Sequence, residues 1–266
     1  MSTTSTPATT GPAARTLPRL GGFTPAMIGL ELRRMLRNRR TVVFTVVMPP
    51  VFFLIFGSGD DLRHQSAGGG NVAGYVLVSM AVYGAMLATT AGGAMVSIER
   101  AAGWSRQLRL TPLRPAAYIA IKIILAMIVG AVSVLATFAV GSVSGARLPT
   151  EAWIGCGLLA WLCALVFAAF GLFMGYLLPS ENVMQILGPV LAVLSFAGGL
   201  FVPVDSLGHT FATIAQFTPV YGVGVIARYP LMHDGGLAVA VLNVLAWTAL
   251  FAAGAVWRFR RDTARV

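Results

Sequence analysis

The chain has 266 residues, a net charge of +10 and an unusually apolar composition. Hydrophobic residues make up 57% of it, charged residues make up only 11%, and the mean hydropathy is +0.79. Soluble domains usually carry about 25% charged residues, so this chain lacks the polar side chains that cover a soluble surface. The composition excludes an ordinary soluble domain and indicates an integral membrane protein. We expect no nucleic-acid partner, because the positive charge lies in short segments between apolar runs.

The chain opens with a polar segment and then a basic amphipathic one. Residues 1–23 are rich in Ser, Thr, Pro and Ala and lack the apolar core of a signal peptide, so we expect a disordered cytoplasmic tail. In "TPAMIGLELRRMLRNRR", residues 24–40, apolar residues recur at helical spacing, with Thr24 and Pro25 suited to begin a helix. The arginines that flank the apolar stripe are Arg33, Arg34, Arg37 and Arg40.

This pattern predicts an amphipathic helix that lies on the inner leaflet, with its arginines near anionic lipid head groups. The alternative is an ordinary positive flank that only sets the orientation of the first span. We therefore count membrane lipids among the expected partners.

Apolar runs of about 20 residues, the length that crosses a bilayer, occur six times in the remaining sequence. The predicted spans are residues 41–58, 72–97, 118–142, 153–178, 184–203 and 236–257. The fold class is therefore an all-α integral membrane protein with six transmembrane helices and an N-terminal interfacial helix. We expect one transmembrane domain over residues 24–260, followed by a short cytoplasmic tail at 261–266.

The distribution of basic residues predicts the orientation of these spans. With the N-terminus in the cytoplasm, the inner side holds 16 of the 19 basic residues, and the outer segments hold only Arg63, Arg147 and Arg228. Cytoplasmic segments carry an excess of Lys and Arg, so both termini are expected inside the cell. Lys122 lies near the inner end of the third span, and we expect it to extend toward the interface as a lipid anchor.

Three features within the predicted membrane region suggest details of packing. Adjacent prolines, Pro49 and Pro50, predict a kink in the first span. A GxxxG spacing at Gly171 and Gly175 favours close packing between helices of this chain. The outer segment at residues 202–236 is too apolar for a solvated loop, so we expect two short helices that dip back into the membrane.

Motifs for chemistry are missing from the sequence. It has no phosphate-binding G-x-x-x-x-G-K-[ST] loop, no H-E-x-x-H zinc motif and no nucleophile elbow. The spans also show no proton relay of the kind that ion-coupled carriers keep at the midplane. We expect no catalytic, cofactor or metal site in this chain and no enzymatic activity of its own.

The segment "ERAAGWSRQLRLTPLRP", which begins at Glu99, interrupts the apolar pattern in the middle of the chain. Trp104 and Leu108 are four residues apart, so they share one helix face, with arginines around it. Such a helix suits either a lipid surface or a groove in a protein. The simpler alternative is an arginine cluster that binds lipid and sets topology.

This segment resembles the cytoplasmic-loop signature of ABC-2 type transporter permeases, in which Glu-Arg-x-x-Gly is followed by Leu-Arg-x-x-Pro. The amphipathic helix before the first span, the "PP" in that span and "FTPVYGVGVIARYP" at 217–230 are also similar to the family. The resemblance covers about residues 25–260 and is strongest to drug-export permeases of the daunorubicin-resistance type. The chain departs from it at Thr218, where the family often has Asn.

The resemblance implies the transmembrane subunit of an ATP-driven exporter in the plasma membrane of a bacterium. Two permeases, as a homodimer or a heterodimer, would pair with two ABC ATP-binding subunits, which would hold ATP and Mg. Loop 98–117 would be the coupling helix, through Glu99, Arg100, Gly103, Trp104 and Leu108. The outer helices would form an exit gate that includes Pro219, Tyr221 and Arg228.

Two classes of function remain open. One is a permease that exports a hydrophobic drug-like or lipid-like substrate, in the manner of multidrug efflux and antibiotic resistance. The other is an ATP-independent membrane channel or scaffold protein with the same topology.

Overall fold

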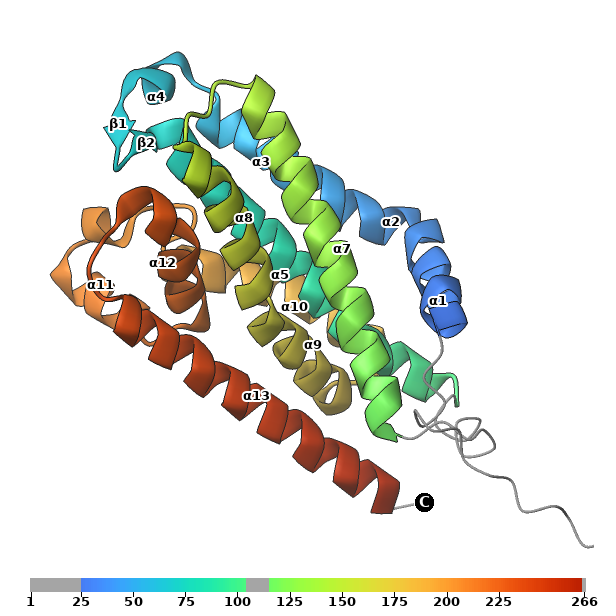
Figure 1. Ribbon diagram of the computed structural model, residues 1–266. Helices are drawn as coiled ribbons and strands as arrows, with labels where there is room; N and C mark the ends of the chain where they lie inside the picture. Colours follow the sequence, from blue (N-terminus) through green and yellow to red (C-terminus); the bar gives the residue numbers. More distant parts are fainter. Residues whose placement is uncertain (1–24, 104–114, 265–266) are drawn as a thin grey trace, which may run out of the picture.

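The computed structural model describes residues 25–103 and 115–264, which form a bundle of helices (Figure 1). The two short strands, β1 (Ser66–Ala67) and β2 (Gly70–Asn71), form an antiparallel hairpin. The helices are α1 (Pro25–Arg37), α2 (Arg39–Val42), the π-helix η1 (Val43–Val47), α3 (Met48–Gly57), α4 (Asp60–His64), α5 (Val72–Ala101), α7 (Pro115–Val143), α8 (Thr150–Cys163), α9 (Leu165–Leu177), α10 (Ser180–Ala197), the 3-10 helix η2 (Val204–Leu207), α11 (His209–Ala215), α12 (Pro219–Met232) and α13 (Leu237–Ala264).

Helix α5 is the centre of the bundle, and it contacts α3, α7, α9, α10 and α12. It is apolar on all sides, and 78% of its most apolar stretch is buried, as expected for a helix surrounded by other helices. The hairpin end of the bundle is the end where α5 follows β2. The loop end is the opposite one, where α5 ends at Ala101 and α7 begins at Pro115 (Figure 1).

The side chain of Asn71 fixes the start of α5 and gathers the loops at the hairpin end. Its Oδ1 accepts hydrogen bonds from the backbone N–H groups of Gly74 (2.9 Å) and Arg147 (2.8 Å). Its Nδ2 donates to the carbonyl oxygens of Arg63 and Gly145, both at 3.0 Å. One buried amide therefore caps the helix and joins three segments of backbone.

Small residues allow α9 to lie directly against α5. A Cβ on Gly171 would lie 2.2 Å from the carbonyl oxygen of Thr90, and one on Gly175 would lie 3.2 Å from Ala94. The predicted GxxxG spacing therefore packs two helices of the same chain, as expected.

The π-helix η1 lies directly before Pro49 in the first apolar helix. Proline has no N–H to donate to the carbonyl four residues earlier, which belongs to Thr45. The hydroxyl of Ser133 in α7 donates to that carbonyl at 2.5 Å. A neighbouring helix thus donates to a carbonyl that the proline cannot reach with a hydrogen bond, which is how membrane helices tolerate proline.

Within the described residues, four helices are long and apolar enough to cross a membrane, or five if the bent pair α11–α12 is one span. The four are Val72–Ala101, Ala117–Val143, Thr150–Leu177 and Leu237–Arg261. They match the second, third, fourth and last predicted spans. Two shorter apolar helices, Val43–Gly57 and Gln185–Ala197, lie where the first and fifth spans were predicted, so the count of six stays a prediction.

Residues 202–236 include two short helices, as predicted. Helices α11 and α12 meet at an angle of 93°. Helix α13 stabilises this turn, because Trp247 donates to the carbonyl of Phe217 at 2.9 Å and Asn243 donates to that of Gln216 at 2.8 Å.

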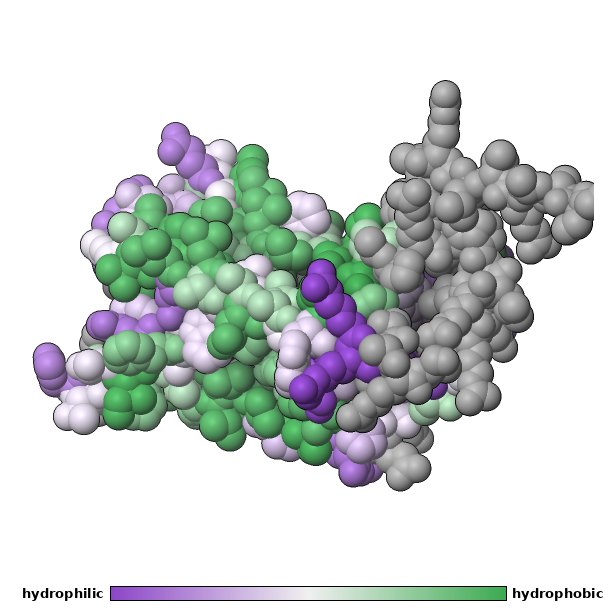
Figure 2. Space-filling model, turned by 90° about the horizontal axis from the view of Figure 1, so that it is seen from below, coloured by the Kyte–Doolittle hydropathy of each residue, from purple (hydrophilic) through white to green (hydrophobic). Residues whose placement is uncertain are grey.

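Much of the outer surface is apolar (Figure 2). Large apolar side chains on several helices are exposed, and only 17% of the most apolar stretch of α13 is buried. They include Leu135, Ile154, Val193, Leu242 and Leu245. An apolar surface of this extent fits a hydrocarbon surrounding better than water.

The α5–α9 contact leads to a stability prediction. Gly171→Ala should lower the free energy of unfolding in detergent by about 1–3 kcal/mol, because the added methyl group overlaps the backbone at Thr90. Gly188→Ala in α10 is the matched control, since a Cβ there meets no atom within 4 Å. Thermal unfolding of both purified variants checks this, and equal melting temperatures would contradict the proposed close contact.

Candidate functional site

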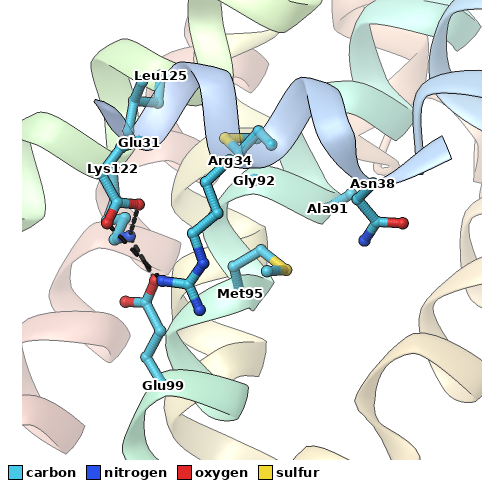
Figure 3. A pocket seen from close by; sticks show the side chains of 10 residues that line it. Glu31, Arg34, Asn38, Ala91, Gly92, Met95, Glu99, Lys122 and Leu125 are labelled. Carbon is cyan, nitrogen blue, oxygen red and sulfur yellow. Dashed lines mark hydrogen bonds and ion pairs between the residues drawn. The ribbon is translucent and has the colours of Figure 1, made fainter. Parts of the chain in front are cut away.

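Three charged side chains from three helices meet inside the loop end of the bundle (Figure 3). The Lys122 ammonium of α7 lies 2.5 Å from Oε1 of Glu99 in α5 and 2.8 Å from Oε2 of Glu31 in α1. The Tyr118 hydroxyl donates to the other oxygen of Glu99. This cluster of Glu31, Glu99, Tyr118 and Lys122 is named the charge cluster below.

The charge cluster is shielded from solvent. The side chains of Lys122 and Glu99 are each 5% exposed, and that of Glu31 is 15% exposed. Burying a lone ion is costly, so each charge here depends on its partner. Lys122 and Tyr118 are one turn apart and face α5 together, which brings both donors to Glu99.

A cavity of about 220 Å³ lies beside the charge cluster, between α1, α5 and α7. Its polar lining comes from Glu31, Arg34, Asn38, Glu99 and Lys122 (Figure 3). Its apolar lining is Met35, Ala91, Gly92, Met95 and Leu125. The lining therefore combines charged and polar side chains with apolar ones.

Helix α1 occupies the range of the predicted interfacial helix. Arg33, Arg34 and Arg37 are exposed, and the side chain of Arg40 lies outside the described residues. Arg34 is loosely paired with Glu31, at 3.9 Å, and its side chain is 63% exposed. The position of this helix at a lipid surface stays a prediction.

The coupling residues predicted from the sequence divide into three groups. Glu99 and Arg100 face inward: Glu99 binds Lys122, and Arg100 donates to the carbonyls of Gly175 and Tyr176 at 3.2 Å. Gly103 follows the end of α5 with φ +74°, a left-handed conformation that suits glycine. Trp104 and Leu108 lie outside the described residues.

The residues predicted for the outer gate lie in one helix but do not share one role. Pro219 is the first residue of α12, and the Thr218 hydroxyl caps that helix by accepting from the N–H of Tyr221 at 3.3 Å. Threonine thus supplies the cap that the family's asparagine would provide. Tyr221 itself is half-buried.

Arg228 is buried, although the sequence placed it in an outer segment. It is 8% exposed, it donates to the Ser79 hydroxyl at 2.9 Å and to the Gly199 carbonyl at 3.3 Å, and it lies 4.6 Å from the centre of the Tyr75 ring. It therefore joins α12 to the central helix and to the turn after α10.

Sequence reasoning was wrong about Lys122 and missed Glu31. Lys122 was expected to extend to the lipid interface, but it is held inside the protein by two carboxylates. A signal for Glu31 existed: it is three residues after Ile28 and four before Met35, so it lies on the apolar stripe of the helix rather than with the arginines. Among the described residues, no group of three or more His, Cys, Asp or Glu could hold a metal ion.

The charge cluster leads to a second stability prediction. Lys122→Met should lower the free energy of unfolding by about 3–5 kcal/mol, because it leaves two carboxylates buried without a cation. Adding Glu99→Gln should recover part of this loss. Asp60→Asn is the control, since it removes an exposed ion pair to Arg63 worth at most about 1 kcal/mol.

Chemical unfolding of the four proteins in detergent measures these differences. A Lys122→Met variant as stable as Asp60→Asn would contradict the buried pairing. So would a double variant that is less stable than Lys122→Met alone.

Comparison with known proteins identifies the family. The chain is 28% identical over 228 residues to the "Putative transport permease YvfS" of Bacillus subtilis (strain 168), a match that covers 83% of this chain and 90% of that protein. Residues 24–231 match the family model described as ABC-2 type transporter. Since this match takes in most of the chain, including α1, the charge cluster and nearly all of α12, the protein belongs to the ABC-2 type transporter family.

Proposed function

We propose that this protein is the permease subunit of an ATP-driven exporter and that loop 98–117 receives the motion of a separate ABC ATP-binding subunit. The observation that supports this is the connection of the loop to the bundle. Glu99 at its start is bound to α7 and α1, and Arg100 is bound to the last turn of α9. A displacement of the loop would therefore be passed to four helices at once, including the central helix α5.

Glu99 and Arg100 act in this proposal as positioning residues. The carboxylate of Glu99 points into the protein, so it would hold the loop in place rather than touch the ATPase. Trp104 and Leu108 would then supply the contact surface, because a large aromatic side chain and a leucine are the residue types that fill a groove in a partner. ATP and Mg would bind on the partner chain.

The orientation in this proposal places the loop end in the cytoplasm of a bacterial cell, with both termini inside the plasma membrane. The charges of the described residues support it. The hairpin end has only the basic residues Arg63, Arg147 and Arg228. The loop end has Arg33, Arg34, Arg37, Arg39, Arg40, Arg100, Lys122, Arg258, Arg260 and Arg261. Such an excess is typical of cytoplasmic segments.

The helix pair α11–α12 would then lie on the outer side as an exit gate. Arg228 would hold the gate closed through its bonds to Ser79 and to the Gly199 carbonyl. A shift of α5 would move Ser79 and release one of these bonds. Helix α5 would thus connect the loop to the gate, because Glu99 at the start of the loop and Ser79, the partner of Arg228, both belong to α5.

The substrate proposed is a hydrophobic drug-like or lipid-like molecule, as in export by the daunorubicin-resistance type of permease, multidrug efflux and antibiotic resistance. The apolar composition of the predicted spans, which have few polar groups, supports this over a charged sugar chain. Two permeases, identical or paralogous, would form the pathway. The second candidate is a channel or scaffold that works without ATP, which the exposed apolar surface would suit equally.

The coupling proposal predicts the effect of a double substitution in the loop. Trp104→Ala with Leu108→Ala should weaken binding to the ATPase by about 30-fold or more, because large side chains at the centre of an interface carry most of its energy. The measurement is co-elution and ATPase rate of the purified complex. Glu99 is left unchanged, because its replacement would disturb the charge cluster.

The matched control is Ile214→Ala with Phe217→Ala. These side chains are 60% and 74% exposed on the outer helices, so the same kind of apolar area is removed far from the loop. Equal ATPase binding and stimulation by both variants would contradict coupling through the loop. Ion conductance by the purified chain alone would favour the channel.

A further inference from the structure

The charge cluster holds more negative than positive charge in its buried part. Glu31 and Glu99 share the single ammonium of Lys122, and both oxygens of Glu99 are engaged, by Lys122 and Tyr118. Oε1 of Glu31 is paired with Arg34 at 3.9 Å, which is beyond hydrogen-bond distance. Glu31, which lines the cavity, therefore has one carboxylate oxygen that accepts no hydrogen bond from the described residues.

Arg34, the cation paired with that oxygen, is weakly held. The Arg34 side chain is 63% exposed, whereas that of Glu31 is only 15% exposed. Water screens an exposed ion pair at this distance, so Arg34 offsets little of the charge of Glu31. A compact ammonium group that enters the cavity would reach Oε1 of Glu31 directly and compensate the excess negative charge.

The rest of the cavity suits an apolar group. Ala91, Gly92, Met95 and Leu125 supply apolar lining beside the charged side chains, and the volume of about 220 Å³ fits a compact molecule. Methionine side chains adapt to ligands of different shape, which favours a site that accepts several related molecules. A carboxylate at one side of an apolar pocket is the chemistry that recognises an amphipathic amine.

We propose that the cavity between α1, α5 and α7 binds the ammonium group of an amphipathic amine, with Glu31 as its counter-ion. The ammonium donates to Oε1 of Glu31, and the apolar part lies against Ala91, Met95 and Leu125. That such an amine is a substrate taken from the inner leaflet rests on the function proposed above, but the binding itself does not. The amine could come from a free compound or from the head group of a phosphatidylethanolamine lipid.

The test is saturation binding of radiolabelled phenylbutylamine to the full chain in phosphatidylcholine nanodiscs, with empty nanodiscs subtracted. We expect Glu31→Gln to weaken binding by about tenfold or more, the effect of losing a charge-assisted hydrogen bond. Lys122 keeps Glu99 as its partner in this variant, so the fold should persist. Glu151→Gln removes an exposed carboxylate at the start of α8 and should bind as the wild type does.

A second variant tests the cavity without changing its charge. Ala91→Leu adds volume inside the space and should abolish saturable binding. Phenylbutanol, which has the same apolar part without the ammonium, should not compete. Equal binding by the wild type, Glu31→Gln and Ala91→Leu, or equal competition by the alcohol, would overturn the proposal.

Two further measurements distinguish a lipid amine from a free amine, and a failure of the binding site from a failure of the exporter function. Weaker binding of the label in phosphatidylethanolamine nanodiscs would assign the site to the lipid head group, and unchanged binding would assign it to a free compound. Loss of ATPase coupling with Glu31-dependent binding intact would refute the exporter and keep the site. Intact ATPase coupling without saturable amine binding would refute the amine site and keep the exporter.

Discussion

The ammonium of Lys122 holds together the loop end of the bundle, where the motion of the proposed ATPase would be received. It is bound to carboxylates from two other helices, so α1, α5 and α7 have a fixed relation at the loop end. None of the three charges would be stable there alone, because each is largely removed from water. The arrangement ties a helix with an exposed row of arginines to the most buried helix of the bundle. The last turns of α5, which precede the loop, are therefore held in place by the ion pair of Glu99 with Lys122.

Polar side chains of neighbouring helices also bind the backbone at two irregular points. Pro49 cannot donate to the Thr45 carbonyl, and the Ser133 hydroxyl donates to it. The turn between α11 and α12 leaves two carbonyls unpaired, and Trp247 and Asn243 bind them. Inside a bilayer there is no water to take these roles, so each irregular point needs a donor from a neighbouring helix. These side chains add polar contacts between neighbouring helices to the apolar packing of the bundle.

The sequence predicted the parts of the fold that depend on local patterns. Long apolar runs gave the positions of α5, α7, α8–α9 and α13, and the spacing of Gly171 and Gly175 gave a close helix contact. The burial of Lys122 and Arg228 could not be predicted, because the position of a charge along a helix does not show what the facing helix offers. Glu31 is an intermediate case: its place on the apolar stripe was visible, but its partner is 91 residues away in the chain. Trp104 and Leu108 lie outside the described residues, so their role is still a prediction.

The hydrogen bonds of Asn71 have a consequence for the order of membrane insertion. Two of its four bonds are to backbone groups of Gly145 and Arg147, which are synthesised more than 70 residues later. The start of α5 is therefore incompletely bonded until the chain beyond α7 has been made. The bonds of Asn71 to Arg63 and Gly74 are local and can form first, whereas those to Gly145 and Arg147 need the far end of α7 to reach the hairpin end. The hairpin end thus closes only once α5 and α7 lie side by side.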